Sequence, residues 1–326
     1  MRERGIAVKR VMICIFAAVI GLGLTGCDRG ATPVGVNQDE KKIITIGVMP
    51  DVESIPLIIA DRNGYFEDEG VKVKIEHFKS ASDRDSALQG GRLDGVITDV
   101  VAVVFSNEGG TDLRIISKND GDIELMAGKE SDIETIVDIK GKSVGLSSNT
   151  IMEYTADRML ESAGISADDV KKVMIPPLST RLEMLQGGKI DAAILPQPLA
   201  GLGVKNGARV LARTSEVVGK AGAIAFTSES LRQNREEIKA VFRAYNRAVE
   251  YLKTEPASSY ADYVVRVQAF PAGLEASLQL PAYEKASPPD PQVVADVVEW
   301  MKNRNLIQKA YEYSDLVDQE ILREIQ

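Results

Sequence analysis

Short apolar runs alternate with helical patterns from Ile43 onward, and this alternation is the strongest structural signal in the chain. In its first part the expected strands are Ile43–Met49, Val71–Phe78, Gly95–Thr98 and Leu113–Ser117, and the expected helices are Ile55–Asp61, Ala81–Gln89 and Val100–Asn107. Parallel strands need a crossover between them, which is usually a helix. This order therefore predicts a mostly parallel sheet with helices on both faces.

A second run repeats this order between residues 143 and 212. Its expected strands are Ser143–Leu146, Lys172–Ile175, Ala192–Leu195 and Arg209–Ala212, and its helices are Met152–Leu160, Arg181–Leu185 and Leu199–Val204. Ile123–Ala127 is expected as an extra strand leading out of the first unit, Gly222–Phe226 adds one more strand, and a helical region follows Leu231. Two similar α/β units predict two lobes.

The first 42 residues have a different character and read as an export and anchoring segment. A basic start precedes the apolar run Val11–Ile20, which ends at Leu24–Thr25–Gly26–Cys27. The run is too short for a confident spanning helix, which needs roughly 20 apolar residues. The four residues ending at Cys27 resemble a bacterial lipobox, which implies cleavage after residue 26 and lipidation of Cys27. Residues 27–42 then form a flexible tether; an uncleaved anchor with an incidental cysteine is the alternative.

The net charge and the reactive side chains argue against several classes of function. Loss of residues 1–26 removes four basic residues and Glu3, so the formal net charge of −9 becomes −12. An acidic chain without a basic stripe argues against nucleic-acid binding. Cys14 leaves with the signal, so the mature chain has only Cys27 and forms no disulfide or cysteine metal site. His77 is the only histidine and is expected at the end of a strand, partly exposed to solvent. A single histidine in this position gives little support to zinc or hydrolytic chemistry.

Polar residues and prolines follow several of the expected strands. In an open α/β sheet, ligands bind outside the carboxyl ends of the strands. The residues at these ends are Pro50–Ser54, Thr98 and Asp99, Asn119 and Asp120, Ser147–Thr150, Pro176–Thr180, and Gln197 with Pro198. Ser147–Thr150 also opens a helix, whose free N–H groups favour an anionic or carbonyl-bearing ligand. The alternative for each residue is an ordinary turn or helix cap.

Five motifs in order carry a resemblance to a known family. They are Gly64–Tyr65–Phe66 with Gly70–Val71, the segment Ala87–Asp94, the segment Asp138–Gly145, the segment Arg181–Ala193, and Pro196–Gln197–Pro198. Over nearly the whole mature chain the sequence resembles the nitrate, taurine, sulfonate and thiamine-precursor family of periplasmic solute-binding proteins of ABC importers. The resemblance implies a type II periplasmic binding protein fold of two α/β lobes joined by two crossovers. Lobe 1 would be residues 43–127 plus 222–326, and lobe 2 would be residues 128–221.

The resemblance also implies a mechanism of capture without catalysis or a cofactor. A small ligand would bridge the lobes, and the closed form would dock on a membrane permease served by an ATPase, with the lipid at Cys27 holding the protein at the outer face of the cell membrane. The family's binding positions map onto Asp51, Glu53, Ser54, Asp99, Ser147, Ser148, Asn149, Thr150 and Gln197. A lipoprotein that reports its ligand to a membrane receptor is the main alternative. Enzymes resembling pyrimidine-precursor synthases fit less well, because of the export signal and the setting of His77.

The sequence leaves the ligand open between two classes. Hydroxyl groups at Ser147–Thr150 and the helix start at Ser179–Arg181 suit a nitrate or sulfonate. Carboxylates at Asp51, Glu53, Asp99 and Asp120 suit an amine, an aminopyrimidine or another ligand rich in N–H groups. Aromatic residues make up only 5% of the chain, and Tyr154 is the main candidate for stacking on a ring in the cleft. Glu153 is expected to face solvent.

Overall fold

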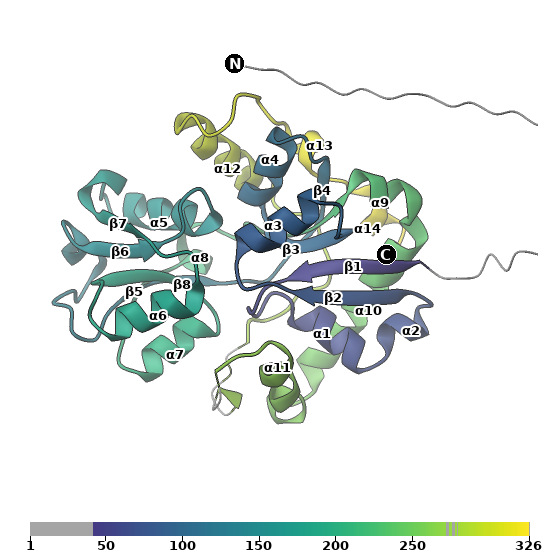
Figure 1. The fold of residues 1–326 in the computed structure, drawn as a ribbon, viewed down its shortest axis with the longest axis horizontal. Helices are drawn as coiled ribbons and strands as arrows, with labels where there is room; N and C mark the ends of the chain where they lie inside the picture. Colours follow the sequence, from purple (N-terminus) through teal and green to yellow (C-terminus); the bar gives the residue numbers. More distant parts are fainter. Residues whose placement is uncertain (1–41, 272–273, 276–277, 279, 326) are drawn as a thin grey trace, which may run out of the picture. The chain divides into compact units, whose positions relative to one another are not determined.

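Two five-stranded sheets, each flanked by helices, organise the chain (Figure 1). The computed structural model describes residues 42–271, 274–275, 278 and 280–325, which belong to one compact unit. The predicted signal segment, Cys27 and all of the predicted tether except Lys42 lie outside the described residues. Within these described ranges, no helix is both long enough and apolar enough to cross a membrane.

The first sheet has the strand order β2-β1-β3-β10-β4. Its strands are β1 (Ile43–Val48), β2 (Lys72–His77), β3 (Gly95–Asp99), β4 (Leu113–Lys118) and β10 (Gly222–Thr227). The strand β10 returns from the second half of the chain and is antiparallel to both of its neighbours, whereas β1, β2 and β3 are parallel. The helices that connect these strands are α1 (Ile55–Arg62), α2 (Tyr65–Asp68), α3 (Ala81–Gln89) and α4 (Val100–Glu108).

The C-terminal part of the chain is largely helical and packs on the first sheet. It contains α9 (Ser228–Gln233), α10 (Arg235–Thr254), α11 (Ala261–Val267), α12 (Pro291–Asn303), α13 (Tyr313–Leu316) and α14 (Glu320–Arg323). On α10 the apolar residues Ile238, Phe242, Tyr245 and Val249 recur at spacings of three and four, as the sequence predicts, and all four are buried. This apolar face of α10 contacts α1 and closes one side of the core.

The second sheet has the order β7-β6-β8-β5-β9. Its strands are β5 (Ile123–Ala127), β6 (Ser143–Leu146), β7 (Lys171–Met174), β8 (Ala192–Pro196) and β9 (Arg209–Arg213), and its helices are α5 (Ile151–Ser162), α6 (Leu178–Gln186), α7 (Leu199–Lys205) and α8 (Thr214–Val217). The sequence prediction that Ile123–Ala127 belongs to the first lobe is wrong, because β5 pairs antiparallel with β8 and β9. We therefore define lobe 1 as the described parts of 42–119 and 222–325, and lobe 2 as residues 122–214.

The two sheets share an internal repeat that extends to individual contacts. The Thr45 N–H donates to Asp94 Oδ2 at 2.8 Å in lobe 1, and the Ser143 N–H donates to Asp191 Oδ2 at 2.8 Å in lobe 2. A side chain at Gly47 would meet Arg84 and Leu93, and one at Gly145 would meet Arg181 and Ile190. In both lobes the closest contact of such a side chain would be an aliphatic group, Leu93 in lobe 1 and Ile190 in lobe 2, and a buried arginine lies beside it.

Candidate functional site

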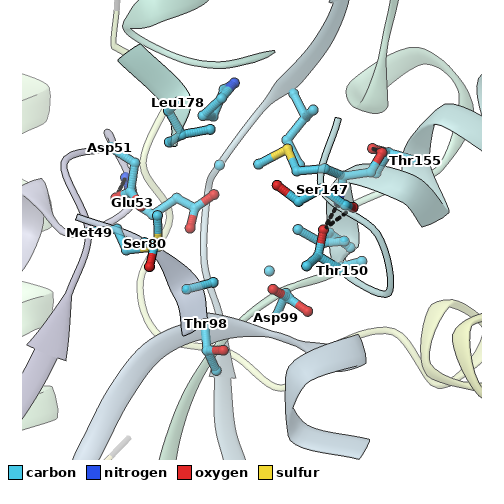
Figure 2. A pocket seen from close by; sticks show the side chains of 18 of the residues that line it. Met49, Asp51, Glu53, Ser80, Thr98, Asp99, Ser147, Thr150, Thr155 and Leu178 are labelled. Carbon is cyan, nitrogen blue, oxygen red and sulfur yellow. Dashed lines mark hydrogen bonds between the residues drawn. The ribbon is translucent and has the colours of Figure 1, made fainter. Parts of the chain in front are cut away.

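A cavity of about 290 Å³ is lined by residues from both lobes (Figure 2). Its polar walls include Asp51, Glu53, Arg84 and Asp99 from lobe 1 and Ser147, Ser148 and Thr150 from lobe 2. Figure 2 shows Asp51 and Glu53 on one wall and Ser147 and Thr150 on the opposite wall. A small molecule in this cavity would contact both lobes at once.

Three carboxylates from lobe 1 reach the cavity. Asp51 follows β1 and accepts hydrogen bonds from the N–H groups of Glu53 at 3.2 Å and Ser54 at 3.3 Å. Asp99 ends β3 and caps α4, since its Oδ1 accepts the Ala102 N–H at 2.8 Å. All three acids follow strands at the same edge of the first sheet, as expected for the carboxyl ends of parallel strands.

Burial dominates the electrostatics of these acids. It raises the pKa of Asp51 to about 6, although the Ser54 N–H and the Arg84 charge act in the opposite direction. Burial likewise raises the pKa of Asp99 to about 6, again against Arg84. The pKa of Glu53 is raised well above its usual value by burial and by the charges of Asp51 and Asp99. Ionisation of these carboxyl groups in the buried cavity therefore costs free energy.

Arg84 is the only cationic side chain among the cavity-lining residues that the structure describes. It is buried, with 3% of its surface exposed. Its Nη1 donates to the Ile97 carbonyl at 2.9 Å and its Nε donates to Asp85 Oδ1 at 2.8 Å. One guanidinium that already pairs with Asp85 does not neutralise three further carboxylates.

The lobe 2 wall is built by the loop before α5. Thr150 caps this helix: its Oγ1 accepts the Met152 N–H at 3.2 Å and donates to the Ser147 carbonyl at 2.8 Å. Ser147 Oγ accepts a hydrogen bond from Nη2 of the buried Arg181. Because that oxygen already accepts, the Ser147 O–H remains available to donate to a ligand. The wall therefore offers hydroxyl donors, and the guanidinium of Arg181 lies directly behind Ser147.

Comparison with known proteins shows to which family the chain belongs. The sequence profile of the family described as "NMT1/THI5 like" matches residues 51–259, which is more than half of the chain. The chain belongs to the NMT1/THI5-like family. This confirms the resemblance found in the sequence.

Relatives of this NMT1/THI5-like protein agree on the fold. An aliphatic sulfonates-binding protein of Bacillus subtilis is 24% identical over 262 residues, which is 77% of each chain. The alkanesulfonate-binding protein of Xanthomonas axonopodis, solved with MOPS, has a TM-score of 0.73 at 18% identity and covers 85% of this chain and 98% of that one. The nitrate-binding protein of Synechocystis has a TM-score of 0.73 at 13% identity, with 88% of each chain covered. A desulfurization enzyme shares the fold at a TM-score of 0.58 and 15% identity, with 87% of this chain and 99% of that one covered.

Three residues predicted at the binding site of this NMT1/THI5-like protein do not line its cavity. Ser54 lies behind Asp51, where its Oγ donates to Asp51 Oδ1 at 3.3 Å and accepts from Gln268 Nε2. The Asn149 N–H donates to Glu153 Oε2 at 2.8 Å, and its side chain is exposed. Gln197 donates to Glu124 Oε1 at 3.1 Å inside lobe 2. Each of these hydrogen bonds lies within one lobe. The other six candidates, Asp51, Glu53, Asp99, Ser147, Ser148 and Thr150, line the cavity.

Three further expectations about cleft residues are also wrong. Tyr154 is 1% exposed and packs edge-on against Trp300 at 5.5 Å between ring centroids, away from the cavity. Glu153 is not at the solvent surface but is buried in an ion cluster with Lys172 and Arg304. Asp120 pairs with Lys220 beside the crossover between the sheets. Residues that are distant in the sequence position all three side chains. The pattern of one helix or loop does not reveal these partners.

Sequence reasoning missed Arg84 and the apolar part of the cavity. Arg84 lies three and four residues before Ala87 and Leu88, so it shares the buried face of α3, and this spacing was the available signal. The apolar lining includes Met49 from lobe 1 and Met152, Met174 and Leu178 from lobe 2. These four residues come from separate elements, and only the folded arrangement brings them to one cavity.

Proposed function

We propose that the protein is the substrate-binding subunit of an ABC importer. It captures a small molecule between its lobes and delivers it to a membrane permease that an ATPase drives. Because the cavity walls come from both lobes, a bound ligand stabilises the arrangement in which the lobes are closed. The family match and the binding proteins among the relatives support this function. Export of the chain and lipidation of Cys27 are part of the proposal, since a permease must be reached from outside the cell.

The three cavity carboxylates determine which class of ligand we propose. Among the described residues that line the cavity, the three acids Asp51, Glu53 and Asp99 outnumber the single guanidinium of Arg84, so the lining has an excess of acidic groups. A ligand with N–H donors or a positive charge satisfies these acceptors and restores their ionised forms. A free sulfonate or nitrate would instead meet charges of its own sign in a medium of low dielectric constant. The ligand is therefore an amine, an aminopyrimidine or a related nitrogen-rich molecule.

The apolar lining sets the second property of the ligand. Met49, Met152 and Met174 present thioether groups that adapt to an irregular apolar surface or to a ring edge. Within the described residues, no three His, Cys, Asp or Glu side chains form a group that could hold a metal ion. An organic ligand with an apolar body thus fits the cavity better than a small inorganic ion.

A sulfonate ligand is the second candidate, and one observation favours it. Ser147, Ser148 and Thr150 supply hydroxyl groups beside the start of α5, where a helix N-terminus attracts anions. Two relatives are named as sulfonate-binding proteins. In that case the anion would lie on the lobe 2 wall, and the carboxylates would stay protonated.

Titration calorimetry with an aminopyrimidine, taurine and an alkanesulfonate tests both the function and the ligand class. The wild-type protein is expected to bind the aminopyrimidine, and Asp99→Asn should weaken that binding about tenfold or more by removing one charge-assisted acceptor. Mass spectrometry of the ligand recovered after incubation should show it unchanged. Conversion of the ligand would contradict a pure binding role, and binding of the alkanesulfonate alone would select the second candidate.

A further inference from the structure

An ion cluster outside the cavity joins the two lobes. Glu153 and Asp157 lie one turn apart on α5 of lobe 2, and Arg304 follows α12 of lobe 1. Arg304 Nη2 donates to Glu153 Oε1 at 2.7 Å, and Arg304 Nη1 donates to Asp157 Oδ2 at 2.9 Å. Lys172 of β7 donates to the same two carboxylates at 2.9 and 2.6 Å. Two acids and two bases thus balance in one cluster that spans the lobes.

Because the two carboxylates are buried, the charge balance of the cluster depends on each of its four side chains. Glu153 is 3% exposed and Asp157 is 8% exposed. Burial raises the pKa of Glu153, but the Asn149 N–H, Lys172 and Arg304 together outweigh it and hold that pKa below the usual value. Removing one cation from a buried cluster leaves a carboxylate without full compensation, which is far more costly than losing a surface ion pair. Glu153 therefore depends on Arg304 from the opposite lobe.

Aromatic contacts fix the geometry of the junction. Trp300 of α12 donates from Nε1 to Asp157 Oδ2 at 3.0 Å, and its ring packs edge-on against Tyr154 of α5. The Arg304 guanidinium lies 5.1 Å from the centre of the Trp300 ring. The indole is buried and the Arg304 side chain is 35% exposed, so the ring and the two carboxylates orient the guanidinium from its buried side.

A backbone hydrogen bond connects the cluster to the loop before α5, in addition to the cavity-lining residues Met152 and Thr155 that lie on the same helix as Glu153. Glu153 Oε2 accepts the Asn149 N–H at 2.8 Å, while Oε1 is held by Lys172 and Arg304. Asn149 has φ +55°, in the left-handed region that asparagine adopts more readily than most residues, and Glu153 holds the N–H group of this turn. The residues on either side of it, Ser148 and Thr150, line the cavity.

We propose that Arg304 is a positioning residue for ligand binding, which holds the lobe 2 loop 147–150 in shape through Glu153 although it touches neither the loop nor the cavity. The inference rests on the proposed function in one respect, namely that this loop contacts the ligand. It adds a specific consequence: the shape of the lobe 2 wall depends on where lobe 1 sits. Lobe closure and the arrangement of the loop are therefore coupled.

Hydrogen exchange measured by mass spectrometry on ligand-free protein tests the coupling without any assumption about the ligand. In Arg304→Gln, peptides covering 147–150 should exchange at least tenfold faster, while peptides covering β8 stay unchanged. Arg304→Lys should restore part of the protection, because a lysine keeps the charge but not the two-pronged contact. The matched control is Lys140→Gln, which removes a cation that pairs with Asp169 at the exposed surface of lobe 2.

A functional readout separates positioning from simple stabilisation. Arg304→Gln and Glu153→Gln should each weaken aminopyrimidine binding several-fold, and the double variant should be no weaker than Glu153→Gln alone, because Arg304 acts through Glu153. Unchanged exchange at 147–150, or equal acceleration throughout lobe 2, would overturn the inference. If exchange responds as expected but no aminopyrimidine binds, the ligand class has failed and the coupling stands.

Discussion

Asn119 donates a hydrogen bond from Nδ2 to Glu53 Oε2 at 3.3 Å, which connects a cavity carboxylate to the segment that joins the two sheets. Asn119 also donates to the Thr98 carbonyl at 3.1 Å and accepts from the Gly121 N–H at 3.2 Å. Glu53 is therefore in direct contact with the first crossover between the sheets.

Gly121→Ala should weaken ligand binding at least tenfold while leaving the fold intact. A Cβ at position 121 would lie 1.9 Å from Glu53 Oε1, so the carboxylate must leave its place on the cavity wall. Calorimetry on the variant measures the affinity, and circular dichroism checks the fold. Gly90→Ala is the control, because it adds a methyl group at the end of α3 without touching the cavity. Equal affinities of Gly121→Ala and the wild type would show that Glu53 does not contact the ligand.

Asp99→Asn should make the ligand-free protein more stable near neutral pH. The folded-state pKa of about 6 lies above the usual value of 3.8, so the folded state binds more protons than the unfolded state between these values. The stability that protonated Asp99 supplies is present below about pH 4 and is lost as the pH rises through about 6. A shift of this size corresponds to roughly 2–3 kcal/mol. Asparagine keeps the helix cap without the charge.

Urea unfolding of both proteins at about pH 4 and about pH 7.5 measures this difference. The variant is expected to gain roughly 2 kcal/mol over the wild type at the higher pH and to match it at the lower pH. A variant that is less stable than the wild type at neutral pH would show that the protein stabilises the Asp99 charge, which contradicts the raised pKa.

The internal repeat predicts matched losses of stability in the two lobes. Asp94→Ala and Asp191→Ala each leave the N–H of a buried strand without its acceptor, at Thr45 and at Ser143 respectively. Each variant should lose about 1–3 kcal/mol of unfolding free energy. Glu183→Ala, at an exposed position of α6, should change it by less than about 0.5 kcal/mol. Losses in only one lobe would show that the two contacts are not equivalent.

Most strands and helices follow from the local sequence. Buried apolar runs such as Gly95–Asp99, bounded by glycine and polar residues, have boundaries within a residue or two of those expected. The local sequence does not predict which sheet β5 joins. Ile123–Ala127 is buried on both faces, and its sequence pattern contains no information about its neighbouring strands. Pairing with β8 and β9 is a long-range choice.

Only part of the candidate site could be predicted from the sequence. Asp51, Glu53 and Asp99 could be found because parallel strands bring their carboxyl ends to one edge of a sheet. Ser54 and Gln197 stand at similar strand ends, but local hydrogen bonds turn their side chains into their own lobes. The dependence of Glu153 on Arg304 joins residues far apart in the chain, and neither position is unusual in its own helix.

The central claim is that the cavity selects a nitrogen-rich ligand over a free anion. Thermal unfolding of the protein with an aminopyrimidine, compared with an alkanesulfonate and nitrate at equal concentrations, tests it most directly. A ligand at about a hundred times its dissociation constant adds roughly 2.7 kcal/mol, which raises the midpoint by several degrees. The midpoint should rise in this way with the aminopyrimidine and stay unchanged with the anions. A rise with the alkanesulfonate or nitrate, and none with the aminopyrimidine, would contradict it.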